Sequence, residues 1–526
     1  MKNKVGRDIP DSMFKTVLKG AEVFQGVNYR DGYVYKKASP TVSGYCAYRE
    51  SKVAGSLKEA IEKTGLKDGM TISFHHHFRD GDYIVNMVMD AVAQMGIKDI
   101  TICPSSLTDC HDHIVPYIED GTITGMLTSG LRGKIGEAVS AGKLKKTAWI
   151  RSHGGRVRAI ECGDIHIDVA FIGAPTSDVQ GNANGLGGKS NCGPLSYAEA
   201  DAKYADKVVI ITDCLVAYPN KPSSIKGIDV DYVVVVDEIG NPEKIASNML
   251  RMTKDPRELK IAKYAAQVIA NTEYFKDGFS YQTGGGGMSL AVSQVLSQYM
   301  ISKNSRMGFA IGGVQKPLVD MLHDGLVGRI VDCQCFDAAA IQSLETDDNH
   351  SEITISEYAN PLNKGCFVNQ LDYVVLSALE IDMDFNVNVT TGSDGVLRGA
   401  LGGHVDTAAG AKCTIIVAPL VRSRIPTVRE RVTTVSTPGE TVDVFVSEYG
   451  IAVNPRRGDL METLKESGLP IYTIEQLKEE AYQLVGKPEE IEYRDEIVAI
   501  VEYRDGTIMD VVRRPAPYVL DEMVQI

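Results

Sequence analysis

The stretch IDVAFIGAPTSDVQGNANG, residues 167–185, returns in altered form as LDYVVLSALEIDMDFNVNVTTG, residues 371–392. Each copy has an aspartate in second place, followed by an apolar run and a turn that contains an acidic residue. An Asn-x-Asn motif follows at the same spacing from the aspartate in both copies. Matching features at a fixed spacing indicate an internal duplication. The sequence therefore predicts two related domains in one chain.

Apolar runs on either side of these copies predict alternating strands and helices. Continuous runs such as residues 70–74, 99–104 and 207–213 are typical of strands buried on both faces of a mostly parallel sheet. Helical spacing of apolar residues over 83–96 and 258–272 predicts amphipathic helices between the strands. We therefore expect an α/β fold made of two duplicated domains with mostly parallel sheets.

The order of these elements also suggests domain limits. We expect an N-terminal arm at residues 1–50, a first domain at 51–254 and a second domain at 255–526. Residues 496–515 contain Asp505-Gly506, a pair typical of a type I′ turn, between two segments that can form strands. This segment predicts a β-hairpin, which we expect as a small C-terminal extension.

Composition excludes several classes of protein. The chain has 526 residues, with 44% hydrophobic and 24% charged residues, as in ordinary globular proteins. Its net charge of −14 argues against nucleic acid as the main partner. We find neither a run long enough to span a membrane nor a secretory signal at the N-terminus. The ten scattered cysteines fit free thiols, so we expect a cytoplasmic protein.

Two glycine-rich loops are candidates for ligand binding, because ligands of parallel α/β sheets bind beyond the carboxyl ends of strands. The loop at 282–290 leads into a helix and could hold a phosphate or thioester against backbone N–H groups; a plain tight turn is the alternative. In the loop at 390–412, Arg398 could pair with a carboxylate and His404 could act as a base or oxyanion donor. The alternative there is a structural loop with a buried histidine. The candidate backbone positions are Gly284, Gly285, Gly286, Gly287, Gly402 and Gly403.

The stretch SFHHHFRDGD, residues 73–82, takes in the first domain the place that the glycine loop takes in the second. On a strand, His75 and His77 would share one face while His76 points away. Together with the later DCHDH motif they could form a metal site, although the spacing is poor for one. Binding of an anion by the histidines and Arg79 is the favoured interpretation, and simple packing is the remaining one.

Four long strings closely resemble one known family. These are DGMTISFHHHFRDGDYIVNMVMD, SHGGRVRAIECGDIHIDVAFIGAPTSDVQGNANG, QTGGGGMSLAV and SALEIDMDFNVNVTTGSDGVLRGALGGHVDTAAGAK. They resemble the alpha subunits of bacterial citrate lyase, over the chain from about residue 50 to its end. The resemblance implies the CoA-transferase fold with two related α/β domains, in agreement with the repeat.

The resemblance also implies an activity and partners. Alpha subunits of this family are citrate CoA-transferases, which exchange acetate for citrate on the CoA-like phosphoribosyl-dephospho-CoA arm of an acyl carrier. A beta subunit then cleaves the citryl group, and the gamma subunit is the carrier. The complex is cytoplasmic and serves citrate fermentation. We expect this chain to bind no metal and no cofactor of its own, to accept acetyl-CoA as a surrogate, and to form a homo-oligomer when alone.

The family leaves two mechanisms open. Ordinary CoA-transferases use a glutamate nucleophile in an S-E-N-G-like motif, which this chain lacks. The resemblance therefore favours direct attack of a citrate carboxylate on the acetyl thioester, with Glu380 as the rival covalent nucleophile. We expect Arg79 and Arg398, with His75, His76 and His77, to bind citrate, the six glycines to hold the arm or an oxyanion, and His404 to assist. The alternatives are a transferase for another acid such as citramalate, and a non-catalytic subunit that only binds CoA or nucleotides.

Overall fold

The computed structural model describes residues 1–2, 10–15, 50–246, 252–284 and 286–516. Met1–Tyr45 and Cys46–Ile526 are separate compact units, and within the first the described residues include one short helix, α1 (Asp11–Phe14). Most of the predicted N-terminal arm thus lies outside the described residues. Among the described residues, no helix is long and apolar enough to cross a membrane.

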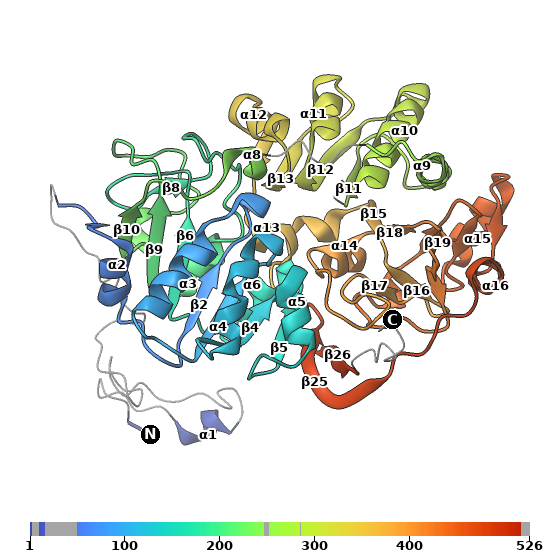
Figure 1. Ribbon diagram of the computed structural model, residues 1–526. Helices are drawn as coiled ribbons and strands as arrows, with labels where there is room; N and C mark the ends of the chain where they lie inside the picture. Colours follow the sequence, from blue (N-terminus) through green and yellow to red (C-terminus); the bar gives the residue numbers. More distant parts are fainter. Residues whose placement is uncertain (3–9, 16–49, 247–251, 285, 517–526) are drawn as a thin grey trace, which may run out of the picture. The chain divides into compact units, whose positions relative to one another are not determined.

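A ten-stranded sheet forms the first half of the larger unit (Figure 1). All its neighbouring strands are parallel except the last pair. In spatial order it contains β1 (Val53–Ala54), β10 (Tyr232–Val235), β9 (Lys207–Thr212), β6 (Val169–Gly173), β2 (Thr71–Phe74), β3 (Ile100–Pro104), β4 (Ile123–Thr128), β5 (Ala148–Arg151), β25 (Tyr493–Glu502) and β26 (Ile508–Pro515). The helices of this half are α2 (Leu57–Thr64), α3 (Ile84–Gln94), α4 (Val115–Glu119), α5 (Gly133–Ser140), α6 (His153–Glu161), α7 (Glu199–Tyr204) and α8 (Pro242–Ile245).

A nine-stranded sheet forms the second half, and only its pair β22–β23 is antiparallel. In spatial order it contains β14 (His350–Glu352), β13 (Ile330–Cys335), β12 (Met307–Val314), β11 (Phe279–Thr283), β15 (Tyr373–Ser377), β18 (Cys413–Val417), β22 (Val444–Val446), β23 (Ile451–Val453) and β24 (Ile471–Tyr472). Its helices are α9 (Pro256–Ala270), α10 (Gly287–Lys303), α11 (Lys316–His323), α12 (Ala338–Thr346), α13 (Ile355–Ala359), α14 (His404–Gly410), α15 (Gly458–Glu466) and α16 (Ile474–Val485).

Short strands and 3₁₀ helices complete both halves. The strands are β7 (Thr176–Ser177), β8 (Ala183–Asn184), β16 (Glu380–Asp382), β17 (Val387–Asn388), β19 (Val421–Arg422), β20 (Ile425–Pro426) and β21 (Val428–Arg429). The 3₁₀ helices are η1 (Arg79–Gly81), η2 (Asp109–Ile114), η3 (Gly227–Asp229), η4 (Phe367–Gln370) and η5 (Gly439–Thr441). Together these elements confirm the α/β class with mostly parallel sheets.

The predicted duplication is visible in the strand order. Seven strands run β10-β9-β6-β2-β3-β4-β5 in the first sheet and β22-β18-β15-β11-β12-β13-β14 in the second. The two aspartates that mark the repeat make equivalent hydrogen bonds. Asp168 accepts the backbone N–H of Thr71 at 2.7 Å, and Asp372 accepts that of Ser280 at 2.9 Å. Each carboxylate therefore ties the start of one central strand to the start of its neighbour.

The turns after β6 and β15 repeat the same hydrogen bonds. Asp178 accepts the backbone N–H of Asn182 at 3.1 Å, and Asp382 accepts that of Asn386 at 2.9 Å. The amide oxygen of each asparagine then accepts a glycine N–H at 2.9 Å, from Gly227 or from Gly439. The acid and the first asparagine of the motif are thus structural parts of both copies.

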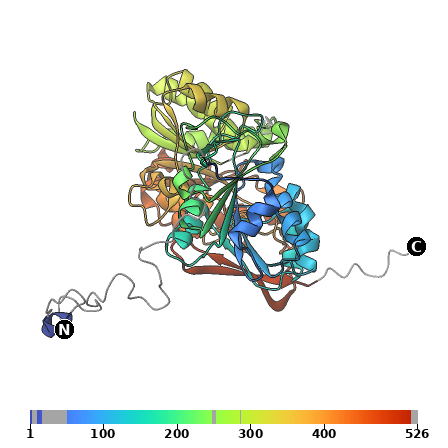
Figure 2. The ribbon, with the colours of Figure 1, turned by 90° about the vertical axis from the view of Figure 1, so that its left-hand side faces the viewer.

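The C-terminal hairpin forms as predicted but extends the first sheet. β25 pairs in parallel with β5, from Ala499 opposite Ala148 to Glu502 opposite Arg151, and Figure 1 and Figure 2 show the hairpin beside the first half. Glu502 accepts hydrogen bonds from Arg151 at 2.9 and 2.8 Å and from Arg158 at 2.9 Å. These buried ion pairs hold the hairpin on the edge of the first sheet. The expected limit between residues 254 and 255 stays a prediction, and the hairpin strands lie outside the second sheet.

Candidate functional site

A cavity of about 570 Å³ lies at the carboxyl ends of β11, β12, β13 and β15. Residues of both halves line it. The first half contributes Arg132, His153 and Tyr197, and the second contributes Gln282, Thr283, Gly284, Gly313, Cys333, Gln334, Phe336, Tyr358, Leu376, Ser377, Ala378, Leu379, Val389, Arg398, Gly399, Ala400, Leu401, Gly403, His404 and Arg422. Its place agrees with the rule that parallel α/β sheets bind ligands beyond their carboxyl strand ends.

The loop between β17 and α14 closes the cavity against the first half. Gly130 and Ala400 form an antiparallel bridge, and the carbonyl oxygen of Gly402 accepts the backbone N–H of His153 at 2.9 Å. Asp406, on α14, accepts the Ser152 hydroxyl and the Gly154 N–H, both at 2.9 Å. The cavity wall is therefore held by hydrogen bonds between segments far apart in the sequence.

Three arginines reach the cavity, and they differ in their partners. Arg398 is 48% exposed and is paired with Asp394 at 2.8 Å and with Glu137 at 3.5 Å. Arg422 is mostly buried, donates to the carbonyl oxygen of Leu379, and has no carboxylate within ion-pair distance among the described residues. Burial lowers the pKa of the Arg422 guanidinium below its ordinary value. The negative charge of Glu380 partly offsets this shift from beyond ion-pair distance, and an anion in the cavity would supply a direct ion-pair partner.

Arg132 and His153 are two of the three residues that the first half contributes to the wall. Arg132 is exposed and precedes α5, and no ion pair to it exists among the described residues. His153 begins α6, and its Nδ1 is buried without a hydrogen-bond partner. Burial, and then the charge of Arg156, lower the pKa of His153 to about 3, so the ring is neutral at pH 7. A neutral ring can donate or accept one hydrogen bond to a ligand.

The three predicted histidines lie beside the cavity and are anchored in the first half. His75 Nε2 lies 3.0 Å from a carboxylate oxygen of the buried Asp201. His77 Nε2 donates to the carbonyl oxygen of Gly173 at 2.9 Å, and burial lowers the pKa of His77 to about 4. His76 bonds the Ser105 hydroxyl at 2.6 Å and packs its ring on His153 and Tyr197. Their predicted role in citrate binding stays a prediction, and the ring of His76 packs on two residues of the cavity wall.

Arg79 is not part of the cavity lining but contacts a residue that is. Its guanidinium carbon is 4.3 Å from the ring centroid of Phe336, a cation–π contact, and Phe336 itself lines the cavity. Burial lowers the pKa of Arg79. Its predicted role as a carboxylate ligand is untested, and its place makes it a less direct ligand than Arg422.

His404 lines the cavity with both ring nitrogens occupied. Nδ1 bonds the Thr437 hydroxyl at 2.7 Å and Nε2 donates to the carbonyl oxygen of Ser377 at 3.0 Å. Burial lowers the pKa of His404 to about 4. A general base needs a ring nitrogen that is free to accept a proton, and both nitrogens of His404 have partners. This geometry suits a structural role of His404 better than the predicted role as a base.

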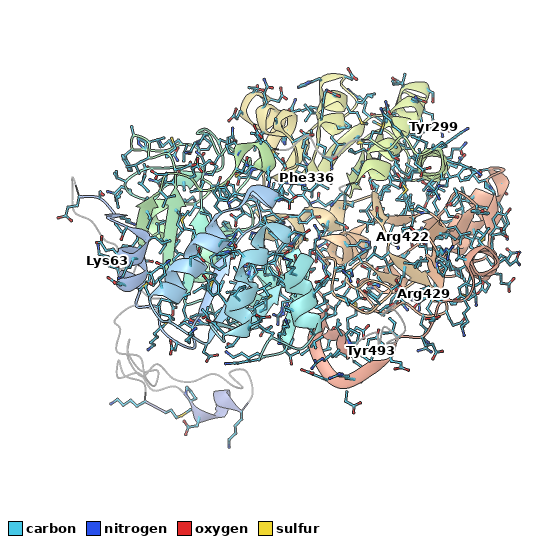
Figure 3. The ribbon with its side chains drawn as sticks, in the orientation of Figure 1. Lys63, Tyr299, Phe336, Arg422, Arg429 and Tyr493 are labelled. Carbon is cyan, nitrogen blue, oxygen red and sulfur yellow. The ribbon has the colours of Figure 1, made fainter. Side chains whose placement is uncertain are left out.

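Glu380, the rival nucleophile, is 2% exposed and lies outside the cavity lining. One carboxylate oxygen pairs with Arg429 and accepts the Thr433 hydroxyl at 3.0 Å. The other accepts the Asn388 amide at 2.9 Å and the Thr433 N–H at 2.8 Å. Arg422 and Arg429, both labelled in Figure 3, belong to β19 and β21 of the second half. A carboxylate with four partners is a poor nucleophile, so its position gives no support to the covalent mechanism.

The predicted glycines are placed unevenly. Gly284 and Gly403 line the cavity, but the N–H of Gly284 donates to the carbonyl oxygen of Val375 at 2.9 Å and is unavailable to an oxyanion. Gly402 has φ +53°, and its position lies beside His153. Gly286 and Gly287 cap and begin α10 outside the cavity lining, and Gly285 lies outside the described residues.

One group of metal-ligand side chains occurs among the described residues, away from the cavity. His166, Asp168 and Asp206 place their ligand atoms within 4.8 Å of one another. Asp168 and Asp206 precede β6 and β9, so the group lies at the amino ends of the strands. The expectation that the chain binds no metal stays a prediction.

The residues that sequence reasoning missed are Arg132, His153, Gln282 and Arg422. Gln282 stands at the head of the glycine motif and His153 lies in the motif SHGG, so both are within recognisable segments. Arg132 lies in a loop and Arg422 in the two-residue strand β19, both without periodicity or motif, and only the folded chain brings them to the cavity.

The fold and this site define an α/β protein with a ligand-sized cavity at the carboxyl ends of parallel strands. The alpha subunit of malonate decarboxylase from Acinetobacter baumannii covers 79% of this chain with a TM-score of 0.61 at 15% identity, and this chain covers 83% of it. That likeness shows the shared fold alone.

The chain belongs to the citrate lyase alpha subunit family, whose model matches residues 50–515. It is 51% identical to the citrate lyase alpha chain of Haemophilus influenzae, over 92% of this chain and 97% of that one, and 52% identical to that of Escherichia coli over 89% and 91%. A structure described as the alpha subunit of citrate lyase from Streptococcus mutans, in complex with citrate, covers 98% of this chain and all of its own, at 54% identity and a TM-score of 0.89.

Proposed function

We propose that this chain is a citrate CoA-transferase: it exchanges acetate for citrate on the CoA-like thiol of an acyl carrier, giving citryl-carrier and acetate. Membership of the citrate lyase alpha family and the citrate bound by the Streptococcus mutans relative support this proposal. Its partners are a lyase subunit and a carrier subunit in the cytoplasm, and alone it forms a homo-oligomer.

The observation that carries the proposal is the mostly buried guanidinium of Arg422 in a cavity of about 570 Å³. Removing a cation from water without a counter-ion is costly, and an incoming carboxylate offsets that cost. Arg132 offers a second unpaired guanidinium for another carboxylate of the same ligand. Arg398 is the weaker candidate because Asp394 already neutralises it.

The proposed reaction needs no protein nucleophile. A citrate carboxylate oxygen attacks the acetyl thioester carbonyl, the C–S bond breaks, and the carrier thiolate leaves. The thiolate then attacks the citryl carbonyl of the resulting mixed anhydride, the C–O bond to acetate breaks, and acetate leaves. Both steps balance without an added proton or oxidant. The protein contributes by positioning the two substrates in a shared cavity, where backbone around Gly403 and the neutral His153 are the nearest candidates to stabilise the developing oxyanion.

A cavity of this kind also fits the carrier arm. Glycines at positions 313 and 403 allow close packing within the wall: a Cβ at Gly313 would lie 2.2 Å from the Phe336 ring, and one at Gly403 would lie 2.5 Å from the Tyr358 hydroxyl. A backbone without side chains also allows a thioester to approach closely. Acetyl-CoA is the expected surrogate for the carrier.

The proposal is tested by incubating the isolated chain with acetyl-CoA labelled in the acetyl group. Citrate should cause release of labelled acetate and formation of citryl-CoA in equal amounts. Citramalate in place of citrate tests the related substrate. No acyl exchange with acetyl-CoA or acetyl-carrier would favour a non-catalytic binding subunit. Trapping of a stoichiometric glutamyl adduct with borohydride or hydroxylamine would favour the covalent mechanism.

A further inference from the structure

Arg504, in the turn of the C-terminal hairpin, reaches into the second half. It lies between β25 and β26, yet it is only 8% exposed. Its Nε donates to a carboxylate oxygen of Asp406 at 3.2 Å, and its Nη2 donates to the carbonyl oxygen of Ala359 at 2.7 Å. Residues of hairpin turns are normally at the surface, so the burial of this charged side chain indicates a role beyond closing the hairpin.

Asp406, on α14, is fully buried and forms an ion pair with Arg504. A buried carboxylate is costly without an opposite charge beside it. Burial raises the pKa of Asp406, and the charge of Arg504 acts against this rise. Arg504 therefore favours the ionised form of Asp406, whose two oxygens only accept hydrogen bonds.

The carboxylate of Asp406 holds the chain on both sides of His153. One oxygen accepts the Ser152 hydroxyl and the other accepts the Gly154 N–H, both at 2.9 Å. The N–H of His153 itself donates to the carbonyl oxygen of Gly402 at 2.9 Å. The start of α6 is thus bonded, residue by residue, to the segment that closes the cavity.

His153 has one ring nitrogen that is open to a ligand. Nδ1 is fully buried, whereas Nε2 keeps accessible surface and has no hydrogen-bond partner among the described residues. The rings of His76 and Tyr197 pack on the His153 ring, with centroids 5.3 and 4.8 Å away. This packing restricts the tilt of the ring, so the bonded backbone sets how far Nε2 reaches into the cavity.

We propose that Arg504 is a positioning residue for the exchange reaction: through Asp406 it holds His153 so that Nε2 faces the developing oxyanion. This rests on the proposed function, in which the His153 ring is a candidate oxyanion donor. A group displaced by about 1 Å loses much of its effect on the rate. The hairpin thus contributes to the reaction from outside the cavity lining.

Steady-state exchange between acetyl-CoA and citrate tests Arg504→Met in the wild-type chain and in His153→Gln. In the wild-type chain, the change should lower kcat at least about 10-fold and alter either KM less than about 3-fold. In His153→Gln it should lower kcat less than about 2-fold further, because the group through which Arg504 acts is gone. An equal fall in both backgrounds would overturn the proposal.

Arg158→Met is the matched control. Arg158 is also buried and donates to Glu502 of the same hairpin at 2.9 Å, but its ion-pair partners are Glu502 and Asp164. Its loss should change kcat less than about 2-fold. A fall as large as in Arg504→Met would show that loosening the hairpin is sufficient, and it would overturn the proposal.

The NMR signal of the His153 ring gives a readout that needs no activity. It is recorded on the full chain labelled with ¹⁵N-histidine and is assigned by its loss in His153→Gln. The signal should shift in Arg504→Met and stay in place in Arg158→Met. An unshifted signal in Arg504→Met would overturn the proposal. A shifted signal in a chain that shows no exchange would refute the proposed function and uphold the positioning of His153.

Arg504→Lys carries the test if Arg504→Met does not fold. A lysine lacks the planar fork with which Arg504 donates to both Asp406 and Ala359. It should lower kcat about 3-fold, and only when His153 is present. No fall, or an equal fall in His153→Gln, would overturn the proposal.

Discussion

The corners after β2 and β11 hold the same place in the two sheets, yet only the second opens on the cavity. At the first corner, His75 and His77 turn inward to Asp201 and Gly173. At the second, Gln282 and Gly284 form part of the cavity wall. The difference teaches that the two copies share the sheet, while one corner is anchored within its own half and the other lines the cavity.

The turns after β6 and β15 show the same division. Thr176 bonds Asn184 at 2.9 Å in the first half, and at the matching place Glu380 bonds Asn388 at 2.9 Å in the second. Arg429 neutralises the added carboxylate. The segment just before Glu380 lines the cavity. The ion pair between Glu380 and Arg429 therefore stabilises the chain next to the cavity wall.

The largest expected effect comes from Arg422→Met, which removes the buried guanidinium of the second half. We expect kcat/KM for citrate to fall at least about 100-fold, because a desolvated charge pair with the substrate is lost. The matched control is Arg398→Met, which should cost less than about 10-fold, because Arg398 is exposed and already paired. Steady-state exchange kinetics measure both variants. A larger loss of kcat/KM in Arg398→Met than in Arg422→Met would instead assign the citrate carboxylate to Arg398.

Glu380→Gln and Thr176→Val compare the two turns directly. We expect Glu380→Gln to lower the free energy of unfolding by about 3 kcal/mol, because Arg429 keeps a buried unpaired charge. Thr176→Val should cost about 1 kcal/mol, since it removes neutral hydrogen bonds. Urea denaturation measures both. Folded Glu380→Gln should retain exchange; complete loss of exchange at unchanged stability would support the covalent nucleophile.

Acid should destabilise both halves through one buried histidine in each. The pKa values of His77 and His404 are about 4 in the folded chain, below the value of 6.5 expected when unfolded. The unfolded chain binds more protons between these values, so their contribution is complete above pH 6.5 and is lost as pH falls toward 4. At pH 5 the free energy of unfolding contributed by each of the two histidines is lower by about 2 kcal/mol than above pH 6.5.

Denaturation of His404→Gln between pH 7 and pH 5 isolates this contribution from other titrating groups. The variant should lose less stability over that range than the wild-type chain does. An equal loss in both would show that His404 is not kept neutral by the fold.

The smallest effect is expected at the first corner, from Arg79→Met. Because Arg79 contacts Phe336 and lies behind the wall, kcat/KM for citrate should change less than about 3-fold, with about 1 kcal/mol of stability lost with the cation–π contact. Exchange kinetics and urea denaturation check this. A sharp rise in the citrate requirement would instead confirm the sequence-based assignment of Arg79.

The sequence predicted the duplication well, because Asp168 and Asp372 act through short-range patterns that survive in both copies. It predicted the glycine loop and the loop of Arg398 as parts of the site, since strand ends and glycines are locally visible. It could not place Arg422, because nothing local shows whether an arginine already has a carboxylate partner.

For a related reason, the sequence could not show which groups hold the three histidines. Three in a row look like a site, but Asp201 and Gly173, which bind two of them, come from distant segments. The hairpin shows the same limit: Asp505-Gly506 predicts its turn, whereas its pairing with β5 depends on the distant Arg151.

A crystal structure of this chain with citrate and a CoA analogue tests the central claim most directly. We expect citrate in the cavity at the carboxyl ends of the second sheet, with a carboxylate on Arg422. Citrate held by Arg79 and the histidines of the first corner, with Arg422 free, would contradict it.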